Sequence, residues 1–144
     1  MMKHKKFQEG DIFFINDISC KDEYLSFNGE HRIGKLVYLS SLFKKMIGFM
    51  PSKNTYSSIP SDLKIEFLPI VMYTVDSELK NGNWTIISHQ NVTDEEILLT
   101  KRRVGNVLML KDQEIRVCTD DDYKKYKNQG FAGLGAIHYL LRNL

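Results

Sequence analysis

The residues that could carry chemistry are few in this chain and lie far apart. A metal site needs several His, Cys or carboxylate ligands brought together, and a nucleophilic serine or cysteine needs a base beside it. No two of the four histidines are near one another in the sequence: they are His4, His31, His89 and His138. The sequence therefore predicts no metal site, no catalytic residues and no cofactor.

Each single candidate has an ordinary structural explanation. His138 falls on a predicted terminal helix, where a surface or core-edge position is expected, and His89 is interpreted as a turn residue that closes a strand. Cys20 and Cys118 share no short-spacing motif, so two buried free thiols are expected, with a long-range disulfide as the alternative. The glycines of 130–135 lack a P-loop lysine, which favours packing at a helix start over phosphate binding.

Runs of like charge fall where helices are predicted to begin. The acidic runs are 94–96 and Asp120, Asp121 and Asp122. Helix capping and the helix dipole explain most of their charge. The second interpretation is that the run 120–122 meets a basic groove on a partner protein. The basic trio 101–103 is interpreted as a solvated turn.

Composition limits the class of protein. The chain has 144 residues, 42% of them apolar and 26% charged, which suits one soluble domain over residues 1–144. Lys and Arg total 20 and Asp and Glu total 18, so the formal net charge of +2 does not indicate a nucleic-acid partner. The longest apolar run, residues 67–73, is too short to cross a membrane, and no export signal follows the basic first residues. A cytoplasmic protein without a membrane partner is expected, and its oligomeric state is not indicated.

The first half of the chain predicts strands. Residues 12–15 are four apolar residues in a row, which favours a strand buried on both faces. Asn28-Gly29 predicts a hairpin between strands at about 24–27 and 32–39. Gly34 inside the second of these strands indicates a bulge or a close backbone approach.

The middle of the chain is more ambiguous. Residues 40–50 favour a short helix, with a strand as the alternative, and residues 51–60 predict a loop that carries Asn54 and Tyr56. Residues 65–75 form an apolar stretch in which Pro69 must lie at an edge or a bulge. A turn at Asn81-Gly82 then leads into a strand that begins with Trp84.

The last third predicts two capped helices, a hairpin and a terminal helix. Thr93 and Glu96 have the spacing of a capping box, and Thr119 or Asp120 caps a helix that ends by Gly130. Runs 107–110 and 115–118 predict a hairpin. The terminal helix presents one apolar face: Leu134, Ile137, Leu141 and Leu144. The whole order predicts an α+β fold, a mostly antiparallel twisted sheet or partial barrel with short helices and a C-terminal helix.

Three runs carry a resemblance to a known family. They are GDIFFI at 10–15, RIGKLV at 32–37, and MYT at 72–74 followed by LKNGNWTII at 79–87. In order and spacing they resemble the GD-I-F-x-I strand, the glycine-containing strand and the G-x-W-x-I-I segment of the bacterial immunity protein 26 family. The resemblance spans roughly residues 7 to 100. It implies that Trp84 is a core anchor and that no catalytic residues are carried over.

The resemblance also implies a function. Such a protein would bind and neutralise a cognate toxin by stoichiometric contact, and it would not be an enzyme. The candidate partner contacts are Asn54 and Tyr56 in the loop 52–58, together with the acidic run 120–122. Two alternatives stay open: a small metal-dependent hydrolase of phosphotriesterase type, in which His89 or His138 meets carboxylates, and a small-ligand or regulatory binding module, which a large apolar pocket would favour.

Overall fold

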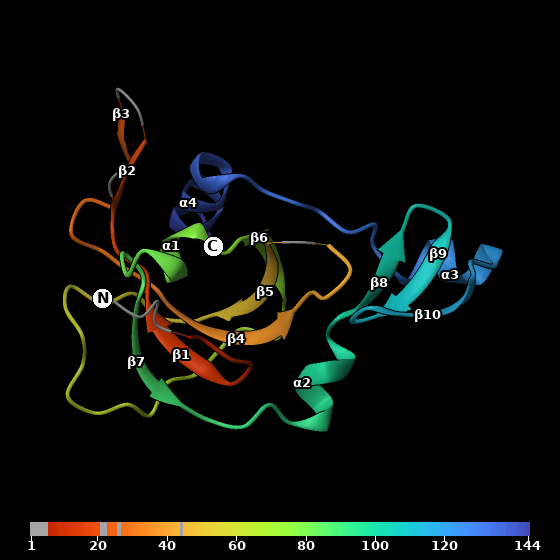
Figure 1. Ribbon diagram of the computed structural model, residues 1–144, viewed down its shortest axis with the longest axis horizontal. Helices are drawn as coiled ribbons and strands as arrows, with labels where there is room; N and C mark the ends of the chain where they lie inside the picture. The colour runs from red at the N-terminus through yellow and green to blue at the C-terminus, as the bar shows by residue number, and fades with distance from the viewer. Residues whose placement is uncertain (1–5, 21–22, 26, 44) are drawn as a thin grey trace.

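The computed structural model describes residues 6–20, 23–25, 27–43 and 45–144, and its centre is a five-stranded antiparallel sheet. The strands are β1 (Asp11–Phe14), β4 (Ile33–Leu39), β5 (Met46–Pro51), β6 (Met72–Val75) and β7 (Thr85–His89). Their order across the sheet is β6-β5-β4-β1-β7, and each neighbouring pair is antiparallel. Figure 1 shows this twisted sheet with α1 (Ser77–Lys80) and α4 (Leu134–Arg142) close to it.

β1 is buried on both faces, as its unbroken apolar run predicts. Alternate side chains of a strand point to opposite faces. Phe13 and Ile15 accordingly enter one buried cluster, whereas Ile12 and Phe14 enter another. Its side chains can be apolar on both faces because a buried cluster covers each face, while β4 and β7 satisfy the backbone at both edges.

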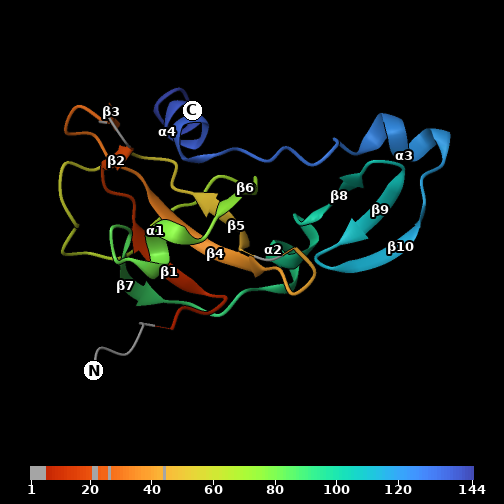
Figure 2. The same ribbon diagram turned by 45° about the horizontal axis from the view of Figure 1, so that its top comes forward.

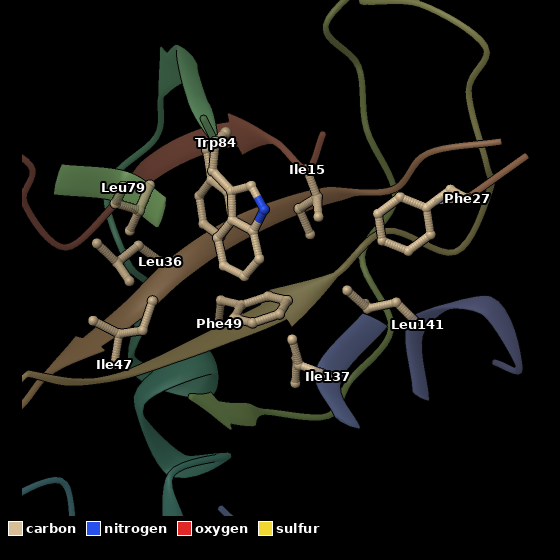
Figure 3. Close-up of a cluster of buried hydrophobic side chains, with 10 residues drawn as sticks. Ile15, Phe27, Leu36, Ile47, Phe49, Leu79, Trp84, Ile137 and Leu141 are labelled. Atoms are coloured by element: carbon tan, nitrogen blue, oxygen red, sulfur yellow. The ribbon is translucent and has the colours of Figure 1, made fainter. Parts of the chain in front are cut away.

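The main core lies between the sheet and the two helices, and Trp84 is at its centre (Figure 3). The indole is 1% exposed, stacks on Phe13 at a centroid distance of 5.6 Å and meets Phe49 edge-on at 6.0 Å. α4 contributes Ile137 and Leu141, both fully buried. The prediction that Trp84 anchors the core is confirmed.

Gly34 makes the close approach that the sequence predicts. A Cβ at this position would lie 2.6 Å from Cζ of Phe13 and 3.0 Å from Cδ2 of Phe49. Only glycine leaves room for the two rings to cross β4 at this point.

A second, smaller unit projects from the side of the main sheet (Figures 1 and 2). It contains the sheet β10-β9-β8 and the helix α3, and α2 (Asp94–Leu98) leads into it. The bounds are β8 Lys101–Val104, β9 Val107–Leu110, β10 Gln113–Val117 and α3 Asp120–Lys125. We call residues 101–125 the projecting unit.

Polar contacts fasten the projecting unit to the main sheet. Asp112, in the β9–β10 turn, accepts hydrogen bonds from the hydroxyls of Tyr38 and Ser40. Lys111 donates to Glu9 Oε1 across 2.6 Å. Residues 127–129 then run beside β8, where the backbone N–H of Gln129 donates to the Arg103 carbonyl across 2.6 Å.

Several local predictions are confirmed. The predicted capping box of Thr93 and Glu96 is present at the start of α2, and Thr119, one of the two predicted caps, is the N-cap of α3, where it forms a capping box with Asp122. The 107–118 hairpin forms as β9 and β10, and the fold is α+β with mostly antiparallel sheets. Over the described residues, no helix has both the length and the apolar character that a membrane crossing requires.

Three predictions about the strands are wrong. Asn28 and Gly29 take the expected positive φ angles of 56° and 81°, but β3 (Glu23–Leu25) pairs with β2 (Ile18–Cys20), and β4 pairs with β1 and β5. The predicted helix at 40–50 is a turn followed by β5, because that segment completes its hydrogen bonds against β4 and β6. The basic trio at 101–103 is not a solvated turn, because it lies in β8.

Candidate functional site

The acidic run at the start of α3 divides into two parts. Asp120 and Asp121 are exposed, whereas Asp122 is 3% exposed and serves the fold. Its carboxylate accepts bonds from Arg116 Nη2 at 2.7 Å and from the Thr119 amide at 2.9 Å. The Arg116 bond is the largest cause that lowers the pKa of Asp122 to about 2. Only Asp120 and Asp121 are therefore free to meet a partner.

Asn54 and Tyr56 lie in the loop after β5. Asn54 is exposed, and its carbonyl accepts a bond from the Ser52 hydroxyl at 2.7 Å. Tyr56 is half-buried, and its backbone exchanges two hydrogen bonds with His31, at 2.8 and 2.7 Å. The loop is thus held against the 27–31 turn and presents Asn54 outward.

The structure does not bring these two predicted contact regions together. Figures 1 and 2 place the loop after β5 at one end of the long axis and α3 at the other. They are two separate surfaces, and one partner domain of ordinary size would contact one of them.

The histidines have different surroundings. Nδ1 of His89 lies 2.9 Å from Asp11 Oδ1, and that bond is the largest cause that raises the pKa of His89. His89 is the last residue of β7, so it closes a strand as predicted, but it is paired with a carboxylate across the sheet. His138 is 2% exposed and stacks on Phe27 at 4.2 Å, which places it in the core and not at its edge.

Within residues 6–20, 23–25, 27–43 and 45–144, neither ring nitrogen of His138 has a hydrogen-bond partner. Burial lowers its pKa to about 4, so the ring is neutral at pH 7. Among the described residues, no group of three His, Cys, Asp or Glu side chains could hold a metal ion. Cys118 is a half-buried free thiol, whereas the prediction for the Cys20 thiol lies outside the described side chains.

β10 is the most exposed element of the projecting unit. It forms the outer edge of the three-stranded sheet, and all five of its residues are exposed. Val117 at its end is 67% exposed and lies opposite Val107, which in turn lies opposite Val104. Directly opposed residues share one face of a sheet, so the three valines form an apolar row across the unit.

The valine row lies on the face away from α3. Arg103 stacks over the Tyr123 ring of α3 at 4.6 Å, so its neighbours Arg102 and Val104 point to the opposite face. There Arg102 packs against the main sheet, whereas the valines lie beyond it. The sequence contains the apolar residues of this row, but only the strand register aligns them.

A cavity of about 550 Å³ lies between β6, β8, α4 and the segment 127–132. Figure 1 shows that segment within the long blue connection from α3 to α4. The lining is mostly apolar, and it includes Ile70, Val71, Met72, Leu99, Phe131, Ile137 and Leu140. The polar lining residues are Tyr73 and Arg102, which are buried, together with Lys127, Asn128 and Gln129 of the segment 127–132. The chain thus contains an apolar pocket of the size that small ligands occupy.

Sequence reasoning missed the two buried polar residues of this cavity, Arg102 and Tyr73. Arg102 was expected to be solvated because it stands between two other basic residues. In the structure it is 5% exposed, with its guanidinium over the rings of Tyr38 at 5.1 Å and Tyr73 at 5.2 Å. One local signal for a strand was available. The β-branched residues Thr100 and Val104 flank the trio, and this pattern is compatible with a strand as well as with a turn.

Comparison of the chain with protein-family models, with curated proteins and with solved structures finds no match.

Proposed function

We propose that this protein is an immunity protein that binds and neutralises a cognate bacterial toxin by stoichiometric contact. The family resemblance of the sequence suggests this class, and one structural observation supports a binding role: β10 is an edge strand with all five residues exposed. An edge strand offers unpaired N–H and C=O groups to a strand of another chain.

The surroundings of β10 suit selective protein binding. The valine row supplies an apolar patch on the face away from α3, and Glu114 supplies a charge on the same face. Arg116, which is paired with Asp122, and the exposed Asp120 and Asp121 supply charge on the α3 side of the same edge. An apolar centre with a charged rim is the usual composition of a protein interface. The bulge between Glu114 and Arg116 discourages indiscriminate pairing, so a partner must match this particular edge.

Two surfaces compete for this role within the proposal. The loop 52–58 was the other expected contact region, but Tyr56 is already engaged with His31 and packs against the cluster of Ile12 and Phe14. We therefore place the toxin on the projecting unit. An interface of about 800 Å² on each partner would extend over β10, the valine row and the start of α3.

Co-expression with the toxin encoded beside this gene tests the proposal. The wild-type chain should rescue growth and elute with the toxin as one complex in gel filtration. Val117→Arg should abolish both results, because it puts a charge in the centre of the proposed contact. Asn54→Arg adds the same charge at the far end of the molecule and should leave both unchanged.

Each other outcome is informative. If Asn54→Arg abolishes rescue and Val117→Arg does not, the toxin binds the loop 52–58 and the assignment to the projecting unit is wrong. If the folded wild-type chain neither rescues growth nor forms a complex, the immunity function itself is wrong.

A further inference from the structure

The inner wall of the cavity contains a buried cation without a negative partner. Arg102 donates from Nε to Gln129 Oε1 at 3.0 Å, and from Nη1 to the carbonyls of Thr100 at 3.0 Å and Lys111 at 2.6 Å. Its Nη2 is closed off from solvent and has no hydrogen-bond partner in the part of the chain that the structure describes. Among the ion pairs of the described residues, none involves Arg102. Its charge therefore meets only ring faces and neutral oxygen atoms.

Tyr73 adds a second unused donor on the same wall. The residue is 7% exposed, its hydroxyl has no partner, and its ring lies under the Arg102 guanidinium. Burial raises the pKa of Tyr73 to about 12, so the hydroxyl keeps its proton and can donate. Both residues line the cavity.

Two adjacent donors without acceptors are costly in a folded protein. Most buried donors in proteins are satisfied, because an unsatisfied one loses its hydrogen bond to water without replacing it. The missing acceptor must offer at least two lone pairs, and a negative charge on it would compensate the guanidinium. A carboxylate has both properties and the planar shape that suits an arginine.

The rest of the cavity determines what the carboxylate is attached to. Ile70, Leu99 and Ile137 line the cavity, and Phe131 and Leu140 line it while remaining 53% and 45% exposed. Exposed apolar side chains around an apolar cavity favour a ligand with a hydrocarbon or aromatic body. The volume of about 550 Å³ accommodates a small organic molecule and not a peptide domain.

We propose that this cavity binds a small organic monocarboxylate, with its carboxylate at Arg102 and Tyr73 and its apolar body along Leu99, Phe131 and Leu140. The donors are closed off from solvent, so a side-chain adjustment on the inner wall must accompany binding. The segment 127–132 forms part of the wall, and backbone hydrogen bonds hold it to Arg103 of β8 and Tyr73 of β6. This site is separate from the proposed toxin surface and does not depend on it.

Isothermal titration calorimetry of the full chain with sodium octanoate tests this proposal, with 1-octanol and inorganic phosphate as comparison ligands. Octanoate should bind at one site. Octanol, which keeps the apolar body and lacks the charge, should bind at least about tenfold more weakly, because hydrogen bonds to charged groups contribute about 1.5–3 kcal/mol. Phosphate, which lacks the body, should not bind measurably.

Two matched variants assign the binding to the cavity. Tyr73→Phe removes only the unpartnered hydroxyl, so it should preserve thermal stability, weaken octanoate binding about tenfold and leave octanol binding unchanged. Tyr38→Phe removes a hydroxyl from the other ring beside Arg102, but that hydroxyl bonds to Asp112 and its residue does not line the cavity. Its octanoate affinity should equal that of the wild type.

Three results would overturn the proposal. The first is that octanoate at millimolar concentration does not bind to the folded protein. The second is that the protein binds octanol, or phosphate, as tightly as it binds octanoate. The third is an unchanged octanoate affinity in Tyr73→Phe, which would place the ligand elsewhere. None of these results bears on toxin binding, and a toxin-binding failure would leave this site intact.

Discussion

The ammonium group of Lys35 donates to Glu96 Oε1 across 2.8 Å and joins the middle of β4 to the first turn of α2. The Lys35 side chain is 4% exposed, and the Glu96 side chain is 18% exposed. Burial raises the pKa of Glu96, but the bonds from Lys35 and Thr93 outweigh that effect and lower the pKa overall. The same carboxylate completes the capping box of α2, so one residue holds the helix start and fixes the helix to the sheet.

Glu96→Gln should therefore destabilise the protein more than a surface substitution does. The amide can keep the capping bond, but it leaves the buried Lys35 charge without a negative partner, with the Asn91 carbonyl at 3.2 Å as a neutral acceptor. We expect a loss of about 2 kcal/mol in the free energy of unfolding, because an unpaired buried charge is strongly unfavourable. Urea unfolding at pH 7 measures it. Glu95→Gln, at an exposed position of the same helix turn, should change stability by less than about 0.5 kcal/mol. Equal effects of the two variants would contradict this account.

His138 should make the fold sensitive to mild acid. Its pKa is about 4 in the folded protein and near the ordinary value of 6.5 in the unfolded chain. The unfolded state therefore binds more protons between these values, and stability falls as the pH drops from about 6.5 towards 4. His138→Phe should abolish most of that loss, which urea unfolding at pH 7.5, 6 and 5 measures.

His89 should change the pH dependence of stability in the opposite direction to His138, so it cannot be the cause of a loss of stability in acid. Its pKa is raised, with Asp11 as the largest cause, so the stability that it contributes is present at low pH and is lost as the pH rises through its folded pKa. The His89 side chain is 38% exposed, so the effect is small. An acid sensitivity that survives in His138→Phe would show that other groups cause it.

Asp112 should control how firmly the projecting unit is attached. Burial raises the pKa of Asp112, but bonds from Tyr38, Ser41 and Ser40 outweigh burial and hold the pKa at about 2. Asp112→Ala leaves the Tyr38 hydroxyl without its acceptor. Amide hydrogen exchange in β8, β9 and β10 should accelerate about tenfold or more, since losing hydrogen bonds to a charged group costs about 1.5–3 kcal/mol.

The controls for Asp112 lie in the same unit and in the main sheet. Asp120→Ala changes an exposed carboxylate of α3 and should leave exchange in β8–β10 unchanged. In Asp112→Ala, exchange in β1 should stay slow because its hydrogen bonds lie in the main sheet. Uniform acceleration across the whole protein would mean that the two units do not open separately.

Gly34→Ala should be one of the most damaging small substitutions. The added methyl would lie 2.6 Å from Cζ of Phe13, whose ring already packs against Phe49 and Trp84. Forcing extra volume into such a packed site costs about 3 kcal/mol, which thermal or urea unfolding would detect. Gly133→Ala is the matched control, because a Cβ there meets nothing within 4 Å. A tolerated Gly34→Ala would mean that the two rings can separate.

Helix caps, turns and buried runs were predictable from the sequence, whereas the pairing of strands with one another was not. The capping boxes at Thr93 and Thr119 depend on residues three positions apart, and the buried run 12–15 depends on composition alone. The turn at Asn28-Gly29 has its predicted backbone angles, yet the strands beside it pair with other segments. A turn signal specifies the bend, whereas the core specifies which strands meet.

Arg102 illustrates the same limit at the candidate site. A basic trio is usually solvated, and its flanking residues Thr100 and Val104 are compatible with a strand without indicating which side chain of the trio is buried. Its guanidinium is held by the rings of Tyr38 and Tyr73 and by the Gln129 side chain, which come from distant parts of the chain. The acidic run was easier to interpret, because Asp122 completes the capping box of its own helix with Thr119, three positions away, and that interpretation needs no distant partner.

The central position of β1 has a consequence for how the protein is made. Although β1 is the first strand of the main sheet, it lies between β4 and β7, and β7 ends at His89. A ribosome that releases the chain from its N-terminus must therefore deliver more than half of it before both edges of β1 are paired. Until β7 has been synthesised, at least one edge of β1 stays unpaired and open to other chains. Chaperones should therefore bind mainly to nascent chains that do not yet contain β7.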